Sequence, residues 1–120
     1  MGYKKHIEAL QLSESKYRAF FESTVDAVFL MQDKYFIDCN KSALEMFGCS
    51  RKDQIVGHTP IEFSPSRQPD GRPSSEKAMG MINKALSGKQ HHFYWLHTRL
   101  DRSTFHTEVT LSPVKIRIKL

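Results

Sequence analysis

Residues 26–48 decide the fold; they read DAVFLMQDKYFIDCNKSALEMFG. The apolar run 27–31 has the length and composition of a buried strand, and residues 35–39 predict a second strand. Residues 32–34, Gln-Asp-Lys, are polar and supply the turn between the two runs. The stretch therefore begins with an antiparallel hairpin.

A short helix follows this hairpin. Asn40 stands where a helix N-cap is expected, because its side-chain oxygen can accept a free backbone N–H of the first turn. Residues 41–47 are the helix, and Gly48 predicts its end, since glycine adopts the left-handed conformation that often closes a helix. A hairpin that leads directly into a capped helix indicates a mixed α and β domain.

The N-terminal segment, residues 3–21, contains no glycine or proline and predicts a helix. Its apolar residues follow alternating steps of four and three, with Glu14 at the one polar position. They are Tyr3, Ile7, Leu10, Tyr17 and Phe21. This pattern is typical of a two-stranded coiled coil and also of an amphipathic helix packed on its own domain. Ser13 is a possible internal cap, so we expect residues 1–13 to be a linker or signalling helix and residues 14–120 to be the domain.

The middle of the chain predicts a loop and a longer helix. Residues 60–73 hold four of the five prolines and predict an exposed, irregular loop. Ser74 or Ser75 then begins a helix that Gly88 ends. One apolar stripe runs along this helix. The stripe consists of Ala78, Met79, Ile82, Ala85 and Leu86.

Two longer strands end the chain, at about residues 91–100 and 104–116, joined at Asp101-Arg102-Ser103. We expect Leu100 to pair with Phe105, and this register puts a mostly apolar set on one face, which we assign to the core. The set is Tyr94, Leu96 and Thr98 with Leu111, Val109 and Thr107.

The opposite face of the same hairpin carries Phe93 and Trp95 among polar side chains. Two large aromatic residues on a polar face indicate that something covers them, and we expect the N-terminal helix or a partner subunit to do so. The whole order of elements predicts an α+β fold. It has an antiparallel sheet covered on one face by short helices, with an N-terminal amphipathic helix.

Composition limits the kinds of partner. The chain has 120 residues, enough for one domain, and carries 18 basic and 13 acidic residues, a net charge of +5. The basic residues are scattered and do not alternate with aromatic residues, so we expect no nucleic-acid partner. There is no run long enough to span a membrane and no signal peptide, so we expect a cytoplasmic domain without membrane contact, whose parent protein can be anchored elsewhere.

Several stretches, in the right order and over nearly the whole chain, resemble bacterial and archaeal PAS domains. They are 15–23 for the entry helix, 26–29 with 40–43 for the first hairpin and helix start, 68–74 for a loop, and 93–97 with 107–111 for the paired strands near the end. The resemblance implies a prokaryotic sensory module of a signal-transduction protein, such as a sensor histidine kinase of a two-component system.

The sequence departs from the family pattern at its C-terminus. A PAS sheet usually has five strands, with the last one central and followed by an Asp-Ile-Thr motif, and this chain stops at Leu120 before such a motif. We therefore expect a C-terminally truncated piece of a longer protein, with the last central strand missing and two edges open to strand exchange. The alternative is that residues 114–119, which alternate apolar and basic side chains, turn back and fill the gap.

No catalytic motif occurs, so we expect no enzymatic activity in this domain, although the parent can be a histidine kinase or a diguanylate cyclase. His97 lies near His106 and Glu108 in the expected register, and we interpret these side chains as a polar pair on the outer surface and not as a metal site. The resemblance implies haem ligation by a histidine of the helix 74–87, which has none. Flavin attachment needs a cysteine within 62–72, which also has none. We predict neither cofactor.

A pocket between the helices and the sheet is the remaining candidate site. Its expected lining is Phe47, Met79, Ile82, Tyr94, Leu96 and Val109. Such a set more often forms a filled core, and a small apolar ligand is the other possibility. We expect a regulatory module that senses a signal or mediates dimerisation, with a homodimer through the N-terminal helix and sheet face and an output domain in the same chain. The alternative is a stand-alone PAS protein that binds a small ligand or haem.

Overall fold

The computed structural model describes the backbone of residues 2–113 and 115–119, and the side chains of residues 7–9, 11–113 and 118. Five strands form one sheet, and helices precede and interrupt them. In chain order the elements are α1 (Gly2–Ser23), β1 (Ala27–Gln32), β2 (Tyr35–Cys39), α2 (Lys41–Phe47), the 3₁₀ turns η1 (Lys52–Gln54) and η2 (Pro60–Phe63), α3 (Ser74–Leu86), β3 (His91–Thr98), β4 (Thr104–Leu111) and β5 (Lys115–Lys119).

The prediction for residues 26–48 is confirmed. β1 and β2 pair antiparallel, and Asp33 in their turn has a φ of 57°, a conformation that aspartate tolerates better than most residues. The Asn40 side chain accepts a hydrogen bond from the Ala43 N–H at 3.0 Å and so caps α2. Gly48 ends α2 in the left-handed region, with a φ of 69°.

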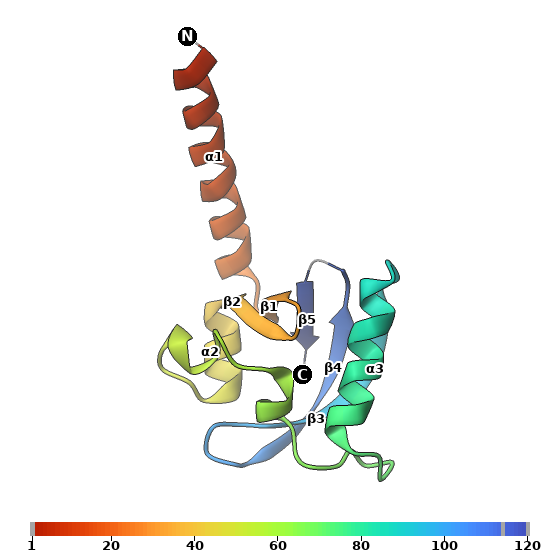
Figure 1. Cartoon of the computed structure of the whole chain (residues 1–120). Coiled ribbons are helices and arrows are strands. Elements are labelled where there is room, and N and C mark those ends of the chain that lie inside the picture. Colours follow the sequence, from red (N-terminus) through yellow and green to blue (C-terminus); the bar gives the residue numbers. More distant parts are fainter. Residues whose placement is uncertain (1, 114, 120) are drawn as a thin grey trace.

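The sheet has the strand order β2-β1-β5-β4-β3, so the last strand lies in its centre (Figure 1). β5 pairs antiparallel with β1 on one side and β4 on the other. The prediction that the central strand is missing, with two edges left open, is therefore wrong. Residues 115–119 occupy that place, as the alternative proposed. Ile118 is 3% exposed and faces the core, which the alternation of apolar and basic residues permits.

The predicted strand 104–116 is in fact two strands. β4 ends at Leu111 and β5 begins at Lys115. Pro113 lies between them, and because proline has no backbone N–H it cannot continue a ladder inside a sheet. The chain turns at this point and returns through the gap between β1 and β4.

The register of the β3–β4 hairpin differs from the predicted one. The last pair before the loop is Thr98 with Thr104, whereas we expected Leu100 to pair with Phe105. The Arg99 N–H also donates to the Ser103 carbonyl at 2.8 Å, which leaves a loop of residues 100–102. Arg102 has a φ of 75°, as in three-residue hairpin loops whose last residue is left-handed. The two registers differ by an odd number of residues, so every β3 side chain faces the side opposite to the prediction.

The core face of β3 consequently carries Trp95 and His97, which are 5% and 6% exposed. Tyr94, assigned to the core from the sequence, is 73% exposed, and Leu96 is half-buried. The assignment for β4 is correct. Its buried residues are Phe105, Thr107, Val109 and Leu111.

Arg102 provides a test of this loop. Replacing Arg102 with glycine will raise the free energy of unfolding by about 1 kcal/mol, because a residue with a Cβ is strained at this φ and glycine is not. Arg102→Ala keeps the Cβ and is the control, so it will give no such gain. Urea unfolding of the three proteins measures both values, and a gain in the alanine variant as large as in the glycine variant would disprove the explanation.

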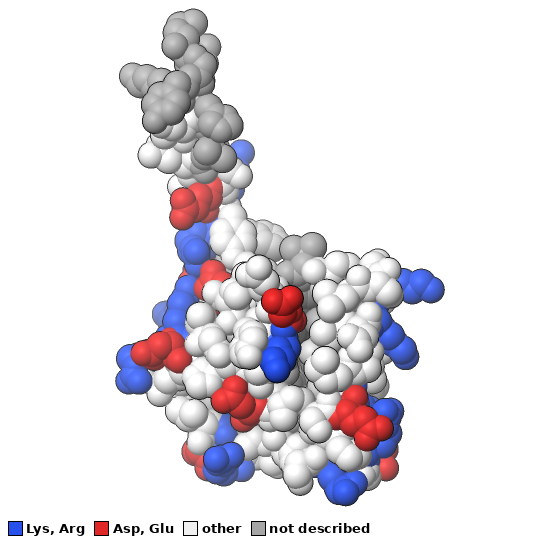
Figure 2. Space-filling view, viewed as in Figure 1, with Lys and Arg blue, Asp and Glu red and all other residues white. Residues whose placement is uncertain are grey.

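The helices α2 and α3 and the 3₁₀ turns cover one face of the sheet, and α1 projects away from the domain (Figure 1). The hydrophobic core lies between the sheet and these covering helices. On the face shown in Figure 2, Lys and Arg side chains are dispersed among Asp and Glu side chains, with uncharged surface between them. This view shows no continuous basic surface, in agreement with the scattered charges of the sequence.

Candidate functional site

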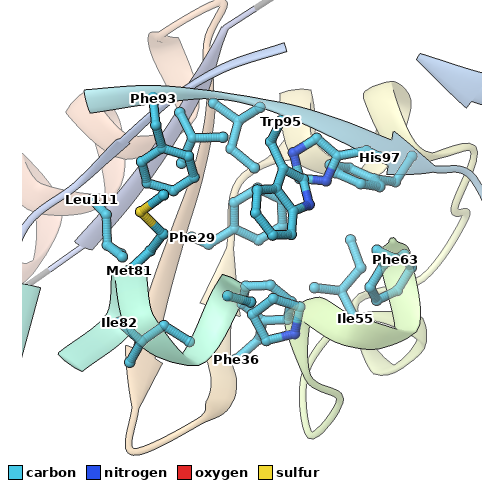
Figure 3. Close-up of a pocket in the computed structure, with 15 residues that line it drawn as sticks. Phe29, Phe36, Ile55, Phe63, Met81, Ile82, Phe93, Trp95, His97 and Leu111 are labelled. Atoms are coloured by element: carbon cyan, nitrogen blue, oxygen red, sulfur yellow. The ribbon is translucent and has the colours of Figure 1, made fainter. Parts of the chain in front are cut away.

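A cavity of about 50 Å³ lies between the inner face of the sheet and the segments η2 and α3 (Figure 3). Its walls come from all layers of the domain, since every strand, α2, η2 and α3 contribute to them. The lining residues are Phe29, Phe36, Phe47, Ile55, Pro60, Phe63, Ala78, Met81, Ile82, Phe93, Trp95, His97, Val109, Leu111 and Ile118. Apart from Trp95 and His97 these side chains have no polar atoms except the methionine sulfur, so the cavity is strongly apolar.

Half of the lining predicted from the sequence is found there. Phe47, Ile82 and Val109 line the cavity. Tyr94 and Leu96 do not, because the register of β3 turns their side chains to the other face. Met79 is 43% exposed, and Met81 of the same helix lines the cavity in its place.

We expected Phe93 and Trp95 to lie on an outer face of the sheet, and this prediction is wrong. Both line the cavity, and they pack edge to face with ring centroids 5.9 Å apart. The Trp95 indole N–H donates a hydrogen bond to the Ser64 hydroxyl at 2.9 Å. Segments of the same chain therefore cover this aromatic pair, and it needs no partner subunit.

His97 is the polar group of the cavity wall. Its ring lies edge-on to Phe47, with centroids 5.1 Å apart, and tilted against Phe105 at 5.6 Å. Burial lowers the pKa of His97 to about 4, and the nearby backbone carbonyl of Phe63 offsets the shift only in part. The Phe63 carbonyl does not meet the geometry of a hydrogen bond, so neither ring nitrogen has a well-formed partner. The imidazole is therefore uncharged at neutral pH and unsatisfied.

The predicted polar pair of His97 with His106 and Glu108 is not formed. His106 pairs with Leu96 and is exposed, whereas His97 pairs with Phe105 and points into the core. Among the described side chains, no three His, Cys, Asp or Glu residues gather as a metal site would require. Burial raises the pKa of Cys39 to about 11, so this thiol is protonated at neutral pH.

Haem and flavin do not fit this cavity. Its volume is several-fold smaller than the pockets that hold drug-sized ligands, which begin at roughly 300 Å³. No cysteine lines it.

Gln68 holds the loop before α3 against the edge strand β3. Its side-chain oxygen accepts the Leu96 N–H at 2.8 Å, and its amide nitrogen donates to the Leu96 carbonyl at 3.1 Å and to the Ser74 hydroxyl at 3.0 Å. A single side chain thus replaces a neighbouring strand at this edge. Sequence reasoning missed Gln68, because a loop glutamine has no local signature for a contact 28 residues away.

The C-terminal end of α1 is fixed to the domain by Asn40. The Asn40 side chain is completely buried and donates to the carbonyls of Phe21 and Asp26, both at 2.9 Å. Its oxygen accepts the N–H groups of Val28 and Ala43, both at 3.0 Å. One side chain therefore joins the end of α1, the start of β1 and the start of α2.

A second set of contacts holds α1 beside β2. Asp38 accepts hydrogen bonds from Arg18 of α1 at 3.3 Å and from Lys52 at 3.0 Å. Burial raises the pKa of Asp38, but hydrogen bonds from Lys52 and from the Cys39 N–H, together with the charges of Lys52 and Arg18, outweigh it, so the pKa lies below its usual value. The Glu22 carboxylate also accepts the backbone N–H of Lys41 at 2.7 Å. An ion pair and a hydrogen bond to the backbone thus hold the last turns of α1 on the domain.

The predicted seam of the N-terminal helix divides into two parts. Phe21 is 3% exposed within its own domain and stacks on Tyr17 with centroids 5.2 Å apart. Ile7 is exposed, and the side chains of Tyr3 and Leu10 lie outside the described residues. The C-terminal end of the seam is therefore packed on the domain itself. Among the described residues, no helix has the length and apolar character needed to cross a membrane.

Comparison with known proteins agrees with the resemblance seen in the sequence. The sequence model of the PAS domain family matches residues 25–119, and no curated protein matches the chain. A domain of a sensory box sensor histidine kinase/response regulator from Geobacter sulfurreducens has a similar fold, with a TM-score of 0.74 and 17% identity over 92% of this chain and 95% of that one.

Two further solved structures are similar. The PAS domain of an HTR-like protein from Haloarcula marismortui has a TM-score of 0.72 and 19% identity, over 97% of this chain and 96% of that one. The PAS domain of a LuxR-family transcriptional regulator from Burkholderia thailandensis, in complex with ethanol, has a TM-score of 0.66 and 17% identity, over 85% and 93%. At these low sequence identities, the similarity shows a shared fold and nothing about function.

Proposed function

Because the chain belongs to the PAS domain family, we propose that it is a non-catalytic sensory module of a multidomain signal-transduction protein. The proposed parent is a sensor histidine kinase, and the similar fold of a domain from such a kinase in Geobacter sulfurreducens supports this choice. The module is proposed to work in the cytoplasm and to pass its signal to an output domain of the same chain.

One observation carries this proposal: the cavity and α1 are connected through β1. Phe29 of β1 lines the cavity, and the N–H of the preceding residue, Val28, donates to the Asn40 side chain. The same side chain donates to the Phe21 carbonyl in the last turn of α1. A displacement of β1 at the cavity would therefore act on α1 through two hydrogen bonds.

We propose that α1 pairs with α1 of a second copy and that the packing of this pair is the output. A signal acts by favouring one of two arrangements of the pair, which requires only that it stabilise them unequally. The proposed boundary between linker and domain, at residues 13 and 14, is supported by exposure. The described side chains before Tyr17 are all exposed, and contacts with the domain begin at Tyr17 and Arg18. Phe93 and Trp95 are not part of the proposed dimer contact, because both side chains point into the cavity.

Self-association of the chain tests the proposal. We expect a dimer by sedimentation equilibrium, and we expect Ile7→Asp to raise its dissociation constant at least about tenfold, because a charge in an apolar helix seam must be desolvated. Gln11→Glu is the control, since Gln11 is exposed and outside the predicted seam. A chain that remains monomeric at high concentration, or a dimer insensitive to Ile7→Asp, would contradict the proposed output.

The second candidate is a stand-alone protein that binds a small ligand. The unsatisfied imidazole of His97 in the cavity wall favours it, and the ethanol complex of the Burkholderia thailandensis domain is compatible with small occupants in this fold. The haem version of this candidate has no support from the cavity, because its volume is too small. The dimerisation experiment separates the two, since ligand binding alone does not require pairing of α1.

A further inference from the structure

The buried imidazole of His97 lacks well-formed hydrogen bonds within the domain. A buried polar group without a hydrogen-bond partner is uncommon and destabilising in a folded protein. Among the described side chains, the only such nitrogen or oxygen atoms are the two ring nitrogens of His97 and the Thr98 hydroxyl. His97 has two of these atoms on one ring, and that ring lines the cavity (Figure 3).

The other groups at the cavity leave His97 without a well-formed hydrogen bond, because the nearby Phe63 carbonyl acts on the pKa of the ring but does not meet hydrogen-bond geometry. The Trp95 indole N–H is the only other polar side-chain group of the described lining apart from the sulfur of Met81, and it already donates to Ser64. The remaining walls are aliphatic or phenyl groups. The cavity thus presents one polar ring to an otherwise apolar space.

We propose that the cavity binds a small neutral molecule with one hydroxyl group and a short apolar tail, and that His97 forms the hydrogen bond to that hydroxyl. This inference rests on the proposed sensory function and names the class of ligand. The class is that of short-chain alcohols.

The size of the cavity limits the ligand to a few atoms. An apolar cavity of about 150 Å³ holds benzene, which corresponds to roughly 25 Å³ for each carbon. The cavity here, at about 50 Å³, therefore holds about two non-hydrogen atoms in its present shape. Met81 lines it and has a flexible side chain, so slightly larger ligands of about three or four atoms can be accommodated.

The chemistry of the walls limits the ligand to an uncharged one. The pKa of His97 is lowered to about 4, so at neutral pH the ring offers one N–H and one bare nitrogen. No charged side chain lines the cavity, and an ion transferred into such a space would lose its hydration without compensation. A hydroxyl can either donate to the bare nitrogen or accept from the N–H, and its carbon tail suits the phenyl and aliphatic walls.

Ethanol is a suitable probe, titrated into the full chain at pH 7 while NMR follows the ring ¹⁵N resonances of His97 and the indole N–H resonance of Trp95, which also lines the cavity and is present in every variant. We expect a saturable shift of these resonances with a dissociation constant in the millimolar range, as fits a ligand of three non-hydrogen atoms. In His97→Leu we expect binding at least about tenfold weaker, because the hydroxyl would enter the cavity without a partner.

Two controls make the result specific. His106→Leu removes the imidazole of a residue that is exposed on the other face of the sheet, and it should bind ethanol as the wild type does. Xenon, which enters apolar cavities, should bind both leucine variants and so report that the cavity persists. The inference is overturned if His97→Leu binds ethanol within twofold of the wild type. It is equally overturned if ethanol leaves the wild-type His97 nitrogens unmoved, whatever the variants do.

This experiment is independent of the one on α1. The self-association of the chain is measured without ligand. A failed ethanol titration therefore contradicts the proposed ligand class and does not contradict the proposed sensory module. A chain that binds ethanol through His97 but never dimerises supports the present inference and contradicts the proposed output.

Discussion

Replacing Asn40 with alanine will lower the free energy of unfolding by about 4 kcal/mol. The substitution removes four hydrogen bonds from a side chain with no exposed surface. Each such bond contributes about 1 kcal/mol, and a buried backbone group left unpaired costs a further penalty. The loss of the cap of α2 is part of this sum. Urea unfolding at pH 7 measures the change.

Asn83 of α3 provides the matched control. It is an exposed asparagine within a helix, so Asn83→Ala should change the free energy of unfolding by no more than about 0.5 kcal/mol. If Asn40→Ala costs less than about 1 kcal/mol, the junction of α1 with the domain does not depend on this side chain.

The second large effect concerns pH. The pKa of His97 in the folded chain, about 4, lies below the value of about 6.5 expected in the unfolded chain. Between these two values the unfolded state binds more protons, so stability is complete above pH 6.5 and is lost as the pH falls towards and through 4. The expected loss from this group is roughly 3 kcal/mol at pH 4.

Comparison with variants isolates this contribution. Asp38 and Glu62 also have lowered pKa values and lose stability in acid, so the wild-type curve alone is ambiguous. In His97→Leu the fall between pH 7 and pH 4.5 should be smaller than in the wild type by about 2–3 kcal/mol. His106→Leu, which changes an exposed histidine, should follow the wild type. Parallel curves for the wild type and His97→Leu would show that His97 is not buried as an uncharged ring.

The parts of the fold that the sequence predicts correctly are those with local signals. The hairpin at residues 27–39 has its own turn, and Asn40 and Gly48 mark both ends of α2. The face of β4 is equally clear, because its apolar residues alternate with polar ones. Such patterns need no knowledge of distant neighbours.

β3 lacks a signal of this kind. Both of its faces carry large aromatic or apolar residues, Phe93 and Trp95 on one and Tyr94 and Leu96 on the other, so alternation cannot decide which is buried. The conformation of the loop determines the register of the hairpin instead. It depends on a positive φ at Arg102, which cannot be predicted from an arginine. This single error placed two of the six candidate cavity residues, Tyr94 and Leu96, on the wrong side of the sheet.

The place of β5 is also a property of the whole sheet. Residues 115–119 alternate between basic and apolar side chains, and from the sequence they could either continue the preceding strand or form a new one. Only the unpaired edges of β1 and β4 favour a new strand between them. His97 and Gln68 gain their roles from contacts across the domain, which no spacing in the sequence reveals.

The central claim is that Asn40 joins α1 to the strands that line the cavity. Amide hydrogen exchange of Asn40→Asp tests it most directly, because aspartate keeps the acceptor for Val28 and Ala43 and removes the donor to Phe21 and Asp26. Val109→Ala, a core change in β4, serves as a control for general destabilisation. We predict that in Asn40→Asp the amides of residues 18–23 lose at least about ten times more protection than those of β3 and β4, whereas in Val109→Ala both regions lose protection equally. An equal loss in both regions of Asn40→Asp would contradict the claim.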